Sequence, residues 1–288
     1  MVGIALVNKQ RIKNNFGKSA VTYDKYAVVQ KEMAVDLMTH LKKPRHEFSN
    51  ILEIGCGTGY LTALLANAFP HARIVALDIA PEMIAIAKES LKGHETIEYV
   101  VSDGENPSFD TAFDLIVSNA VFQWFTGYIE PFKRYCRLLE PEGYLIFNTL
   151  GERTLEELRY CVSTLNSENK LSQASINLPS KKAVLKALYE AGFVDPVVND
   201  SIKKAYYASA RHFILAIKNT GTSGFSNQGL APGGIGIEVF KLIRLYNRYF
   251  SDNRRVFASY HCLIGYAKKC RARPGGERAV SINYRSRD

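Results

Sequence analysis

The sequence predicts an α/β protein with a doubly wound, mostly parallel sheet, and three observations support this fold class. Short apolar runs alternate with longer amphipathic segments over residues 50–150. The gap between neighbouring runs has room for a single helix, and strand–helix–strand connections favour parallel neighbours. Hydrophobic residues make up 47% of the 288 residues, enough to bury a full core. No run of about 18 apolar residues occurs, so no membrane span is expected.

The first half of the chain supplies five strands and the helices between them. Apolar residues at helical spacing predict a helix over residues 24–42. Pro70 ends the next helix, Pro81 begins the one after, and Gly93 is the expected C-cap of the latter. The predicted strands lie at residues 51–54, 73–78, 97–103, 113–120 and 143–150. The predicted helices lie at residues 61–69, 81–91 and 128–139.

The second half adds two strands and a cap. Strands at residues 197–207 and 256–269 complete a predicted seven-stranded sheet. Helices are predicted at residues 154–165, 181–192, 209–221 and 237–250, the third with Ser209 as its N-cap and Gly221 at its end. The last two helices fall between the last two strands. We therefore expect a helical cap inserted over about residues 208–252, with a flexible glycine-rich loop over 221–236 inside it.

One domain is expected over residues 1–270. Its expected parts are an N-terminal helical lid segment at 1–45, a ligand-binding core at 46–150, and the remaining sheet with its cap at 151–270. Residues 271–288 hold five arginines against one Glu and one Asp and show little apolar periodicity. They are expected to form a basic, disordered tail.

Composition narrows the function classes. The five cysteines are scattered without CxxC spacing and the six histidines form no HxxxH pair, so neither a disulfide framework nor a metal site is predicted. This pattern is typical of a reduced, cytoplasmic protein. The net charge of +9 suggests an acidic partner, which composition alone leaves open as nucleic acid, an anionic membrane or an acidic protein.

The glycine-rich stretch ILEIGCGTGY at residues 51–60 indicates a ligand site at the end of the first strand. A dinucleotide fingerprint would require glycine at position 60, which is Tyr, and the P-loop pattern is also absent. The stretch reads ExGxGxG instead, with Glu53 before the glycines Gly55, Gly57 and Gly59. Such glycines let a backbone turn sharply and approach a ligand closely. Asp78 and Asp103 end the next two strands, and in such sheets a carboxylate like Asp78 accepts hydrogen bonds from ribose hydroxyls.

Four segments in this order, LEIGCGTG, ALDIAPEMIAIAK, VVSDGEN and FDLIVSNAVFQW, resemble the class I S-adenosylmethionine-dependent methyltransferases. The resemblance covers residues 51–150 and implies a Rossmann-like sheet that binds S-adenosylmethionine and releases S-adenosylhomocysteine. It implies that the glycine loop lies beneath the methionine part, that Asp78 binds the ribose and that Asn119 lies beneath the sulfonium. Cys56 is expected to be a small filler inside the loop. The implied cofactor-binding residues are Tyr23, Gln30, Glu53, Gly55, Cys56, Gly57, Gly59, Asp78, Ile79, Met83, Asp103, Gly104, Glu105, Asn119 and Ala120. An alternative for Asp78 is a carboxylate that only caps the helix at Pro81.

The N-terminal segment resembles a narrower family, the malonyl-acyl carrier protein O-methyltransferases of biotin synthesis. The family pattern F-x3-A-x2-Y-D-x2-A-x2-Q is matched by Phe16, Ala20, Tyr23, Asp24, Ala27 and Gln30, and the Q-W pair by Gln123 and Trp124. The sequence departs from the family at Tyr246-Asn247, where Tyr-Glu is more common, and in the glycine-rich loop 222–234. The substrate pocket is therefore the part that the resemblance defines least.

The resemblance implies methyl transfer to the free carboxylate of a malonyl group on acyl carrier protein. A carboxylate is already ionised at pH 7, so no general base is required. Catalysis then depends on alignment and on exclusion of water. Arg211 is predicted to bind the carboxylate, with Tyr23, Gln123 and Trp124 orienting the substrate. The alternatives are an ordinary exposed arginine at 211, a core tyrosine at 23 and a packed ring at 124.

Two groups of cations are predicted to dock the acidic carrier protein. Lys241, Arg244 and Arg248 form one stripe of the late helix, and Lys9, Arg11, Lys13 and Lys18 crowd the N-terminal segment. A solvated charged surface is the alternative for both groups. We expect a monomer whose partner is the malonyl-carrying protein, without nucleic acid or membrane as partners.

Two other functions share the predicted cofactor site. The first is a carboxyl methyltransferase of a free small acid such as trans-aconitate, or of another small metabolite, which would need no basic docking surface. The second is a methyltransferase acting on nucleic acid, or a binder without activity. Against the second, SNAVFQW follows the fourth strand where base-methylating enzymes carry an NPPY-type motif.

Overall fold

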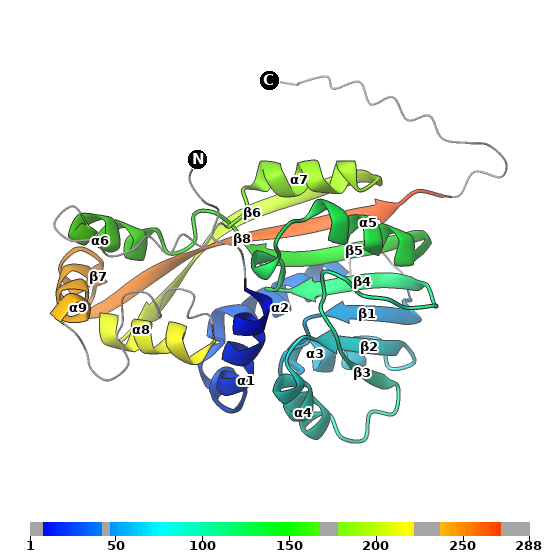
Figure 1. The fold of residues 1–288 in the computed structure, drawn as a ribbon, viewed down its shortest axis with the longest axis horizontal. Helices are drawn as coiled ribbons and strands as arrows, with labels where there is room; N and C mark the ends of the chain where they lie inside the picture. Colours follow the sequence, from blue (N-terminus) through cyan, green and yellow to red (C-terminus); the bar gives the residue numbers. More distant parts are fainter. Residues whose placement is uncertain (1–7, 42–46, 167–177, 222–236, 272–288) are drawn as a thin grey trace.

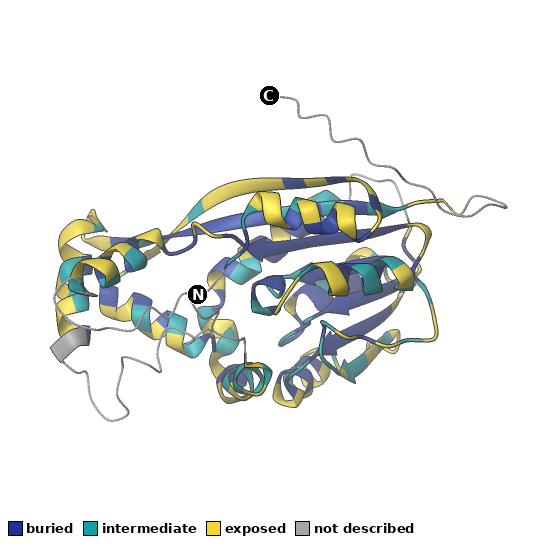
Figure 2. Ribbon diagram, turned by 45° about the horizontal axis from the view of Figure 1, so that its top comes forward, coloured by how far each residue is buried: buried dark blue, intermediate teal, exposed yellow. Residues whose placement is uncertain are grey.

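The fold was determined from a computed structural model, which describes residues 8–41, 47–166, 178–221 and 237–271. The predicted flexible loop and basic tail lie almost entirely outside the described residues. A mixed sheet runs through the centre of the molecule, with helices on both of its faces (Figure 1). The central strands of the sheet and the inward sides of the helices are buried, whereas its two edge strands are more exposed (Figure 2).

The sheet confirms the predicted fold class. Its order is β3(Ile97–Val101), β2(Arg73–Asp78), β1(Asn50–Ile54), β4(Phe113–Asn119), β5(Leu139–Leu150), β8(Arg255–Lys269) and β6(Phe193–Tyr207). The first five strands are parallel, and β8 runs antiparallel to both β5 and β6. A two-residue strand, β7(Ser251–Asp252), pairs with β8 in addition to the seven predicted strands. The strand order reverses between β1 and β4, where doubly wound sheets bind ligands.

Two cores cover the two faces of the sheet. On one face, α2(Val28–Leu41) and α3(Tyr60–Ala68) pack on β1, β4 and β5 through Leu37 and Leu65, and α4(Pro81–Ser90) lies beside them on β2. On the other face, α5(Ile129–Leu138) and α7(Lys181–Glu190) pack through Phe132 and Leu188. Both sets of helices pack apolar side chains against the sheet, and this packing holds the middle strands in place.

Some boundaries differ from the prediction. The helix expected over residues 24–42 is two helices, α1(Lys9–Tyr26) and α2, which break at the buried Ala27. Beside this break, Asp24 accepts a hydrogen bond from Thr58 Oγ1 at 3.0 Å and pairs with Lys31. β5 begins four residues before the expected start, at Leu139. Gly93 does take a positive φ of 97°, but α4 is capped two residues earlier, by Leu91.

The predicted cap is present. The far ends of β6 and β8 extend beyond β5 and carry α6(Glu156–Asn166), α8(Ala210–Asn219) and α9(Ile237–Tyr249) (Figure 1). Ser209 caps α8 by accepting a hydrogen bond from the His212 N–H, as predicted. Phe213 of α8 and Tyr246 of α9 pack with their rings tilted by 40° and their centroids 5.1 Å apart, and they belong to the cap's own core.

Candidate functional site

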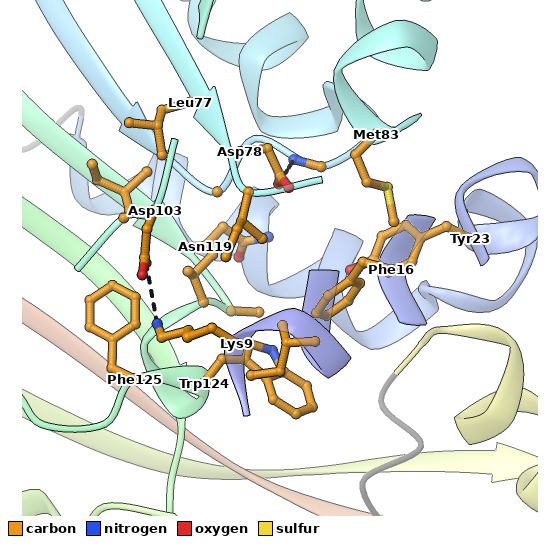
Figure 3. A pocket seen from close by; sticks show the side chains of 18 residues that line it. Lys9, Phe16, Tyr23, Leu77, Asp78, Met83, Asp103, Asn119, Trp124 and Phe125 are labelled. Carbon is orange, nitrogen blue, oxygen red and sulfur yellow. Dashed lines mark hydrogen bonds and ion pairs between the residues drawn. The ribbon is translucent and has the colours of Figure 1, made fainter. Parts of the chain in front are cut away.

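Two adjoining cavities open at the carboxyl ends of β1, β2 and β4. The larger holds about 640 Å³ and the smaller about 380 Å³ of space free of protein atoms, including the open solvent at their mouths. Tyr23, Gly55, Gly57 and Asn119 line both cavities and so mark the junction between them. Figure 3 shows the larger cavity, with side chains from the strand ends on one side and from α1 on the other.

The glycine loop forms the floor of this junction. Gly55, Gly57 and Gly59 have φ values of +74°, +54° and +90°, a region that residues with a β-carbon rarely adopt. A β-carbon on Gly57 would meet no atom within 4 Å, whereas one on Gly55 would collide with Val121. Gly57 therefore faces open space and Gly55 permits the turn after β4 to approach. Gly59 lines neither cavity and serves as the N-cap of α3.

Four N–H groups of the loop are already bonded within the protein. Gly55 and Cys56 donate to the Leu77 carbonyl, Gly57 donates to Asp78 Oδ2, and Gly59 donates to the Cys56 carbonyl. A phosphate-binding loop presents such groups to its ligand instead. The loop therefore fits a ligand that approaches the glycines without a phosphate.

Asp78 links the glycine loop to α4. Its oxygens accept hydrogen bonds from the Gly57 N–H at 2.9 Å and from the Ala80 N–H at 2.8 Å. Burial raises the pKa of this carboxyl, and the backbone N–H groups of Ala80, Gly57 and Ile79 act against that shift. Each oxygen keeps a further lone pair, and the side chain lines the larger cavity. Asp78 thus occupies the helix N-terminus, as in the alternative interpretation, and can also accept bonds from a ligand.

Glu53 lines the smaller cavity and is only 1% exposed. Thr62 Oγ1 donates to it at 2.7 Å, and among the residues that the structure describes no lysine or arginine pairs with it. Burial raises the pKa of the Glu53 carboxyl from 4.5 to about 8. A cationic ligand group in this cavity would supply the missing counter-charge.

Asn119 presents an unused acceptor at the junction. Its Nδ2 donates to the Gln30 carbonyl at 3.1 Å, while its buried Oδ1 has no hydrogen-bond partner. Buried polar atoms are nearly always bonded, so a lone acceptor beside two cavities points to a ligand donor. Gln30, like Glu53, also lines the smaller cavity.

The rest of the larger cavity is mostly apolar. Phe16, Ile79, Met83, Trp124 and Phe125 contribute its walls, and Phe16 meets Trp124 edge to face at 5.5 Å (Figure 3). Gly104 and Ala120 also line it. Such walls suit a flat, uncharged ring system.

Lys9 lies inside this cavity, which does not fit the docking role predicted for it. Its ammonium is 3.2 Å from Asp103, pairs with Glu105, and lies 5.0 Å from the centre of the Phe125 ring (Figure 3). Asp103 and Glu105, which were both predicted to bind the cofactor, therefore have the Lys9 ammonium between them. Glu105 itself bonds Thr126 and does not line either cavity.

The helix α1 forms a lid over the larger cavity. Lys9, Ile12, Phe16 and Tyr23 all reach it from this helix. Burial and the Asp78 carboxylate raise the pKa of the Tyr23 phenol, so Tyr23 stays protonated and can donate a hydrogen bond. Cys56 lines the smaller cavity, and burial together with Asp78 raises the pKa of its thiol, as expected for a filler rather than a nucleophile.

Two predicted substrate residues are not brought to the cavities. Gln123 is 7% exposed and its side-chain amide is bonded to Ala120 and Thr149, so it faces the interior. Arg211 is exposed on the first turn of α8 and lines neither cavity. The opposite end of α8 is the one that meets α1, where Gly221 packs against Ser19. Trp124 and Tyr23 do lie in the site.

The predicted docking cations separate into two groups. Lys241, Arg244 and Arg248 are all exposed on α9, together with the rings of Phe240 and Tyr249, which are 56% and 50% exposed. Arg244 lies 5.9 Å from the Phe240 ring centre and Arg248 lies 5.5 Å from that of Tyr249. We call these five residues the α9 face.

On α1, only one of the four predicted cations is exposed. Lys18 is exposed, whereas Arg11 and Lys13 are half-buried. One buried guanidinium nitrogen of Arg11 has no hydrogen-bond partner.

Neither a metal cluster nor a membrane-spanning helix occurs in the part of the chain that the structure describes. Within residues 8–41, 47–166, 178–221 and 237–271, no cluster of three or more His, Cys, Asp or Glu side chains could hold a metal ion. In the same residues, none of the helices combines the length and the apolar character that crossing a membrane requires.

Asn148 and Thr149 line neither cavity but bond residues beside the site, and the sequence did not reveal this role. Asn148 is 1% exposed, accepts a bond from the Ala120 N–H at 2.9 Å and donates to the Met33 carbonyl at 2.8 Å. Thr149 bonds Gln123. Both belong to the apolar stretch GYLIFNTL, in which two polar residues at the strand end were the only available signal.

Comparison with known proteins adds a family likeness to this geometry. Residues 52–147 match the family model of a methyltransferase domain. The chain is 32% identical over 273 residues to the malonyl-[acyl-carrier protein] O-methyltransferase of Acetivibrio thermocellus, covering 92% of this chain and 95% of that protein. It is 35% identical over 274 residues to the protein of the same name from Priestia megaterium, covering 90% and 97%. A solved phosphoethanolamine N-methyltransferase 2 of Haemonchus contortus shares the fold, with a TM-score of 0.52, 19% identity, and coverage of 82% of this chain and 52% of that one.

Proposed function

The chain belongs to the malonyl-[acyl-carrier protein] O-methyltransferases, and we propose that it transfers a methyl group from S-adenosylmethionine to the free carboxylate of malonyl-acyl carrier protein. The observation that carries this proposal is identity above 30% across nine-tenths of the chain, together with a cavity at the switch point of the sheet. The methyl ester would prime the pimeloyl chain of biotin synthesis.

The residues of the two cavities fit S-adenosylmethionine. This group supplies an electrophilic methyl on a sulfonium, and it carries hydroxyl and ammonium donors but no phosphate. Asp78 offers free acceptor sites for the ribose, and Glu53 and Asn119 Oδ1 offer acceptors for the ammonium. Ile79 and Met83 line the apolar part where the adenine would lie.

Catalysis by the chain consists of alignment and water exclusion. When bound, S-adenosylmethionine would supply the methyl group to a carboxylate oxygen of the substrate and leave as S-adenosylhomocysteine, so no residue of the chain would need to move a proton. Tyr23 remains a neutral phenol and can hold the other carboxylate oxygen by a hydrogen bond. Phe16 and Trp124 form an aromatic wall that keeps water from the reacting atoms.

The partner would bind at the α9 face. Its arginines are exposed, and its two exposed rings can contact apolar surface, which is the mixture of residues enriched at protein interfaces. An acyl carrier protein is acidic, so its charge is complementary to this face. A methyltransferase of a free small acid would need no such face.

Mass spectrometry of the acceptor tests the proposal. Malonyl-acyl carrier protein, free malonate and free trans-aconitate are each incubated with the enzyme and S-adenosylmethionine. We expect one added methyl group on the carrier-bound malonyl, and loss of that product when the acyl group is acetyl, which has no free carboxylate. Faster methylation of a free acid than of the carrier-bound malonyl would contradict the proposal and favour the small-acid alternative.

A further inference from the structure

The turn after β4 contains a strained residue at the wall of the larger cavity. Ala120 has a φ of +55°, in the left-handed region that disfavours any residue with a β-carbon. It lines the cavity between Asn119 and Val121, which line it too. Such backbone conformations persist only where the surroundings hold them in place.

Two buried side-chain amides hold this turn. The Ala120 N–H donates to Asn148 Oδ1 at 2.9 Å and to the Asn148 carbonyl at 3.1 Å, and the Ala120 carbonyl accepts from Gln123 Nε2 at 2.6 Å. Gln123 and Asn148, which we call the amide clamp, thereby bond both polar groups of the Ala120 backbone. Both side chains are buried.

The clamp is itself anchored in two other elements. Gln123 Oε1 accepts hydrogen bonds from Thr149 Oγ1 at 2.9 Å and from the Leu150 N–H at 3.4 Å, both in β5. Asn148 Nδ2 donates to the Met33 carbonyl in α2 at 2.8 Å. These hydrogen bonds therefore fix the turn relative to β5 and to α2, the helix that follows the lid.

The turn positions two side chains at the junction of the cavities. On one side of Ala120, Asn119 places its unpaired Oδ1 beside both cavities. On the other side, Val121 packs so closely on Gly55 that a β-carbon there would collide with it. A rotation of the Ala120 backbone would move both contacts at once, because the flanking residues share its peptide bonds.

We propose that Gln123 and Asn148 are positioning residues that hold Ala120 left-handed, and so fix the Asn119 acceptor and the approach of Val121 to the glycine loop. Gln123 then acts through Ala120 rather than by touching the substrate, in contrast to its predicted role. This inference rests on the proposed function, since the cavity that it shapes is the proposed site of S-adenosylmethionine.

A double-mutant comparison tests the inference. Gln123→Met keeps the length of the side chain but removes every hydrogen bond of the amide. Ala120→Gly removes the β-carbon that makes the left-handed conformation unfavourable. In this background the turn should therefore depend less on the hydrogen bonds of the clamp. The ratio of Kd values for S-adenosylhomocysteine with and without Gln123→Met is measured by calorimetry in both backgrounds. We expect a ratio of about tenfold in the native background, the effect of one to two lost hydrogen bonds, and of about twofold in the Ala120→Gly background.

Thermal unfolding separates positioning from stability. Gln123→Met should lower Tm in both backgrounds, because the bonds to Thr149 and Leu150 are lost in each. Ser259→Ala is the matched control: it removes a buried hydrogen bond to Glu157 in the cap, and should lower Tm while leaving the Kd unchanged. A Kd ratio that is equal in the two backgrounds, or a Kd unaffected by Gln123→Met, would overturn the inference.

The outcome is independent of the substrate. Binding of S-adenosylhomocysteine needs no malonyl group, so the ratio can support the clamp even if malonyl-acyl carrier protein is not methylated. Conversely, methylation of the carrier protein with equal ratios in the two backgrounds would uphold the proposed function and reject the clamp.

Discussion

Single residues give the site its chemical character through acceptor oxygens with unused lone pairs. Glu53, Asp78 and Asn119 approach the junction of the cavities with lone pairs to spare, and Tyr23 is the neutral donor among them. A ligand rich in donors and bearing a positive charge complements such a set. No residue is needed as a base, because the proposed nucleophile is already ionised.

Glu53 should make the ligand-free protein less stable as the pH rises. Its pKa is raised in the folded state from 4.5 to about 8, so the folded protein binds an extra proton between these two values. Stability is therefore present below about pH 4.5 and is lost as the pH rises through about 8. We expect Glu53→Gln to raise the free energy of unfolding at pH 8 by about 1 kcal/mol or more. Urea titrations at pH 5 and pH 8 measure this, and a gain at pH 5 as large as at pH 8 would contradict it.

Arg211 can be tested directly against its predicted role. The exposed position on α8 gives it no described contact with the cavity, and exposed arginines contribute little. We expect Arg211→Ala to change KM and kcat for malonyl-acyl carrier protein by no more than about twofold. A loss of about tenfold to a hundredfold, the effect of a missing charged hydrogen bond, would instead restore Arg211 as the residue that binds the carboxylate.

Among the elements, α1 decides access to the larger cavity. This helix supplies one wall of the cavity. Its Gly17 packs closely on α4, because a β-carbon on Gly17 would lie 2.6 Å from the Glu82 carboxylate. Its Asp24 accepts a hydrogen bond from Thr58 of the glycine loop. At its first turn, Lys9 pairs with two carboxylates across the cavity. Because α1 forms one wall of the cavity, we expect its contacts to limit ligand exchange.

Lys9→Met should therefore speed release of S-adenosylhomocysteine. The ion pair is partly exposed, with side-chain exposures of 26% and 37% for Lys9 and Asp103, so its contribution is modest. We expect the dissociation rate in a stopped-flow displacement to rise by about three- to tenfold, with a smaller change in the association rate. Lys18→Met, on the exposed side of the same helix, is the control. An equal change of the dissociation rate in both variants would show that the ion pairs of Lys9 do not slow ligand release.

The sequence predicted the strands and the glycine loop because both depend on local pattern. Buried parallel strands are continuous apolar runs, and three glycines with positive φ can be foreseen from their spacing alone. The roles of Gln123 and Lys9 could not be foreseen, because their partners lie 26 and 94 residues away along the chain. The break at Ala27 also escaped prediction, since Asp24 beside it bonds Thr58, which is 34 residues away.

At the scale of the whole molecule, the larger cavity and the proposed docking surface lie in different places. The larger cavity lies at the carboxyl ends of β1, β2 and β4. The cap with its α9 face lies at the end of the extended strands β6 and β8 (Figure 1). The net charge of +9 attracts any acidic protein, whereas a face with rings among its arginines can also fix an orientation. A docking test must therefore separate local from overall charge.

Charge reversal at two places makes this separation. Arg244→Glu with Arg248→Glu changes the net charge by the same amount as Lys182→Glu with Lys186→Glu, which alters exposed residues of α7 away from the cap (Figure 1). We expect the α9 pair to raise KM for malonyl-acyl carrier protein by about tenfold and to weaken its dependence on salt, because close charge pairs at an interface are lost. The α7 pair should raise KM by no more than about twofold, because it removes only long-range attraction. Binding of S-adenosylhomocysteine should be unchanged in both. Equal effects of the two pairs would mean that overall charge suffices, and an unaltered KM in the α9 pair would move docking to Lys13 and Lys18 of the lid.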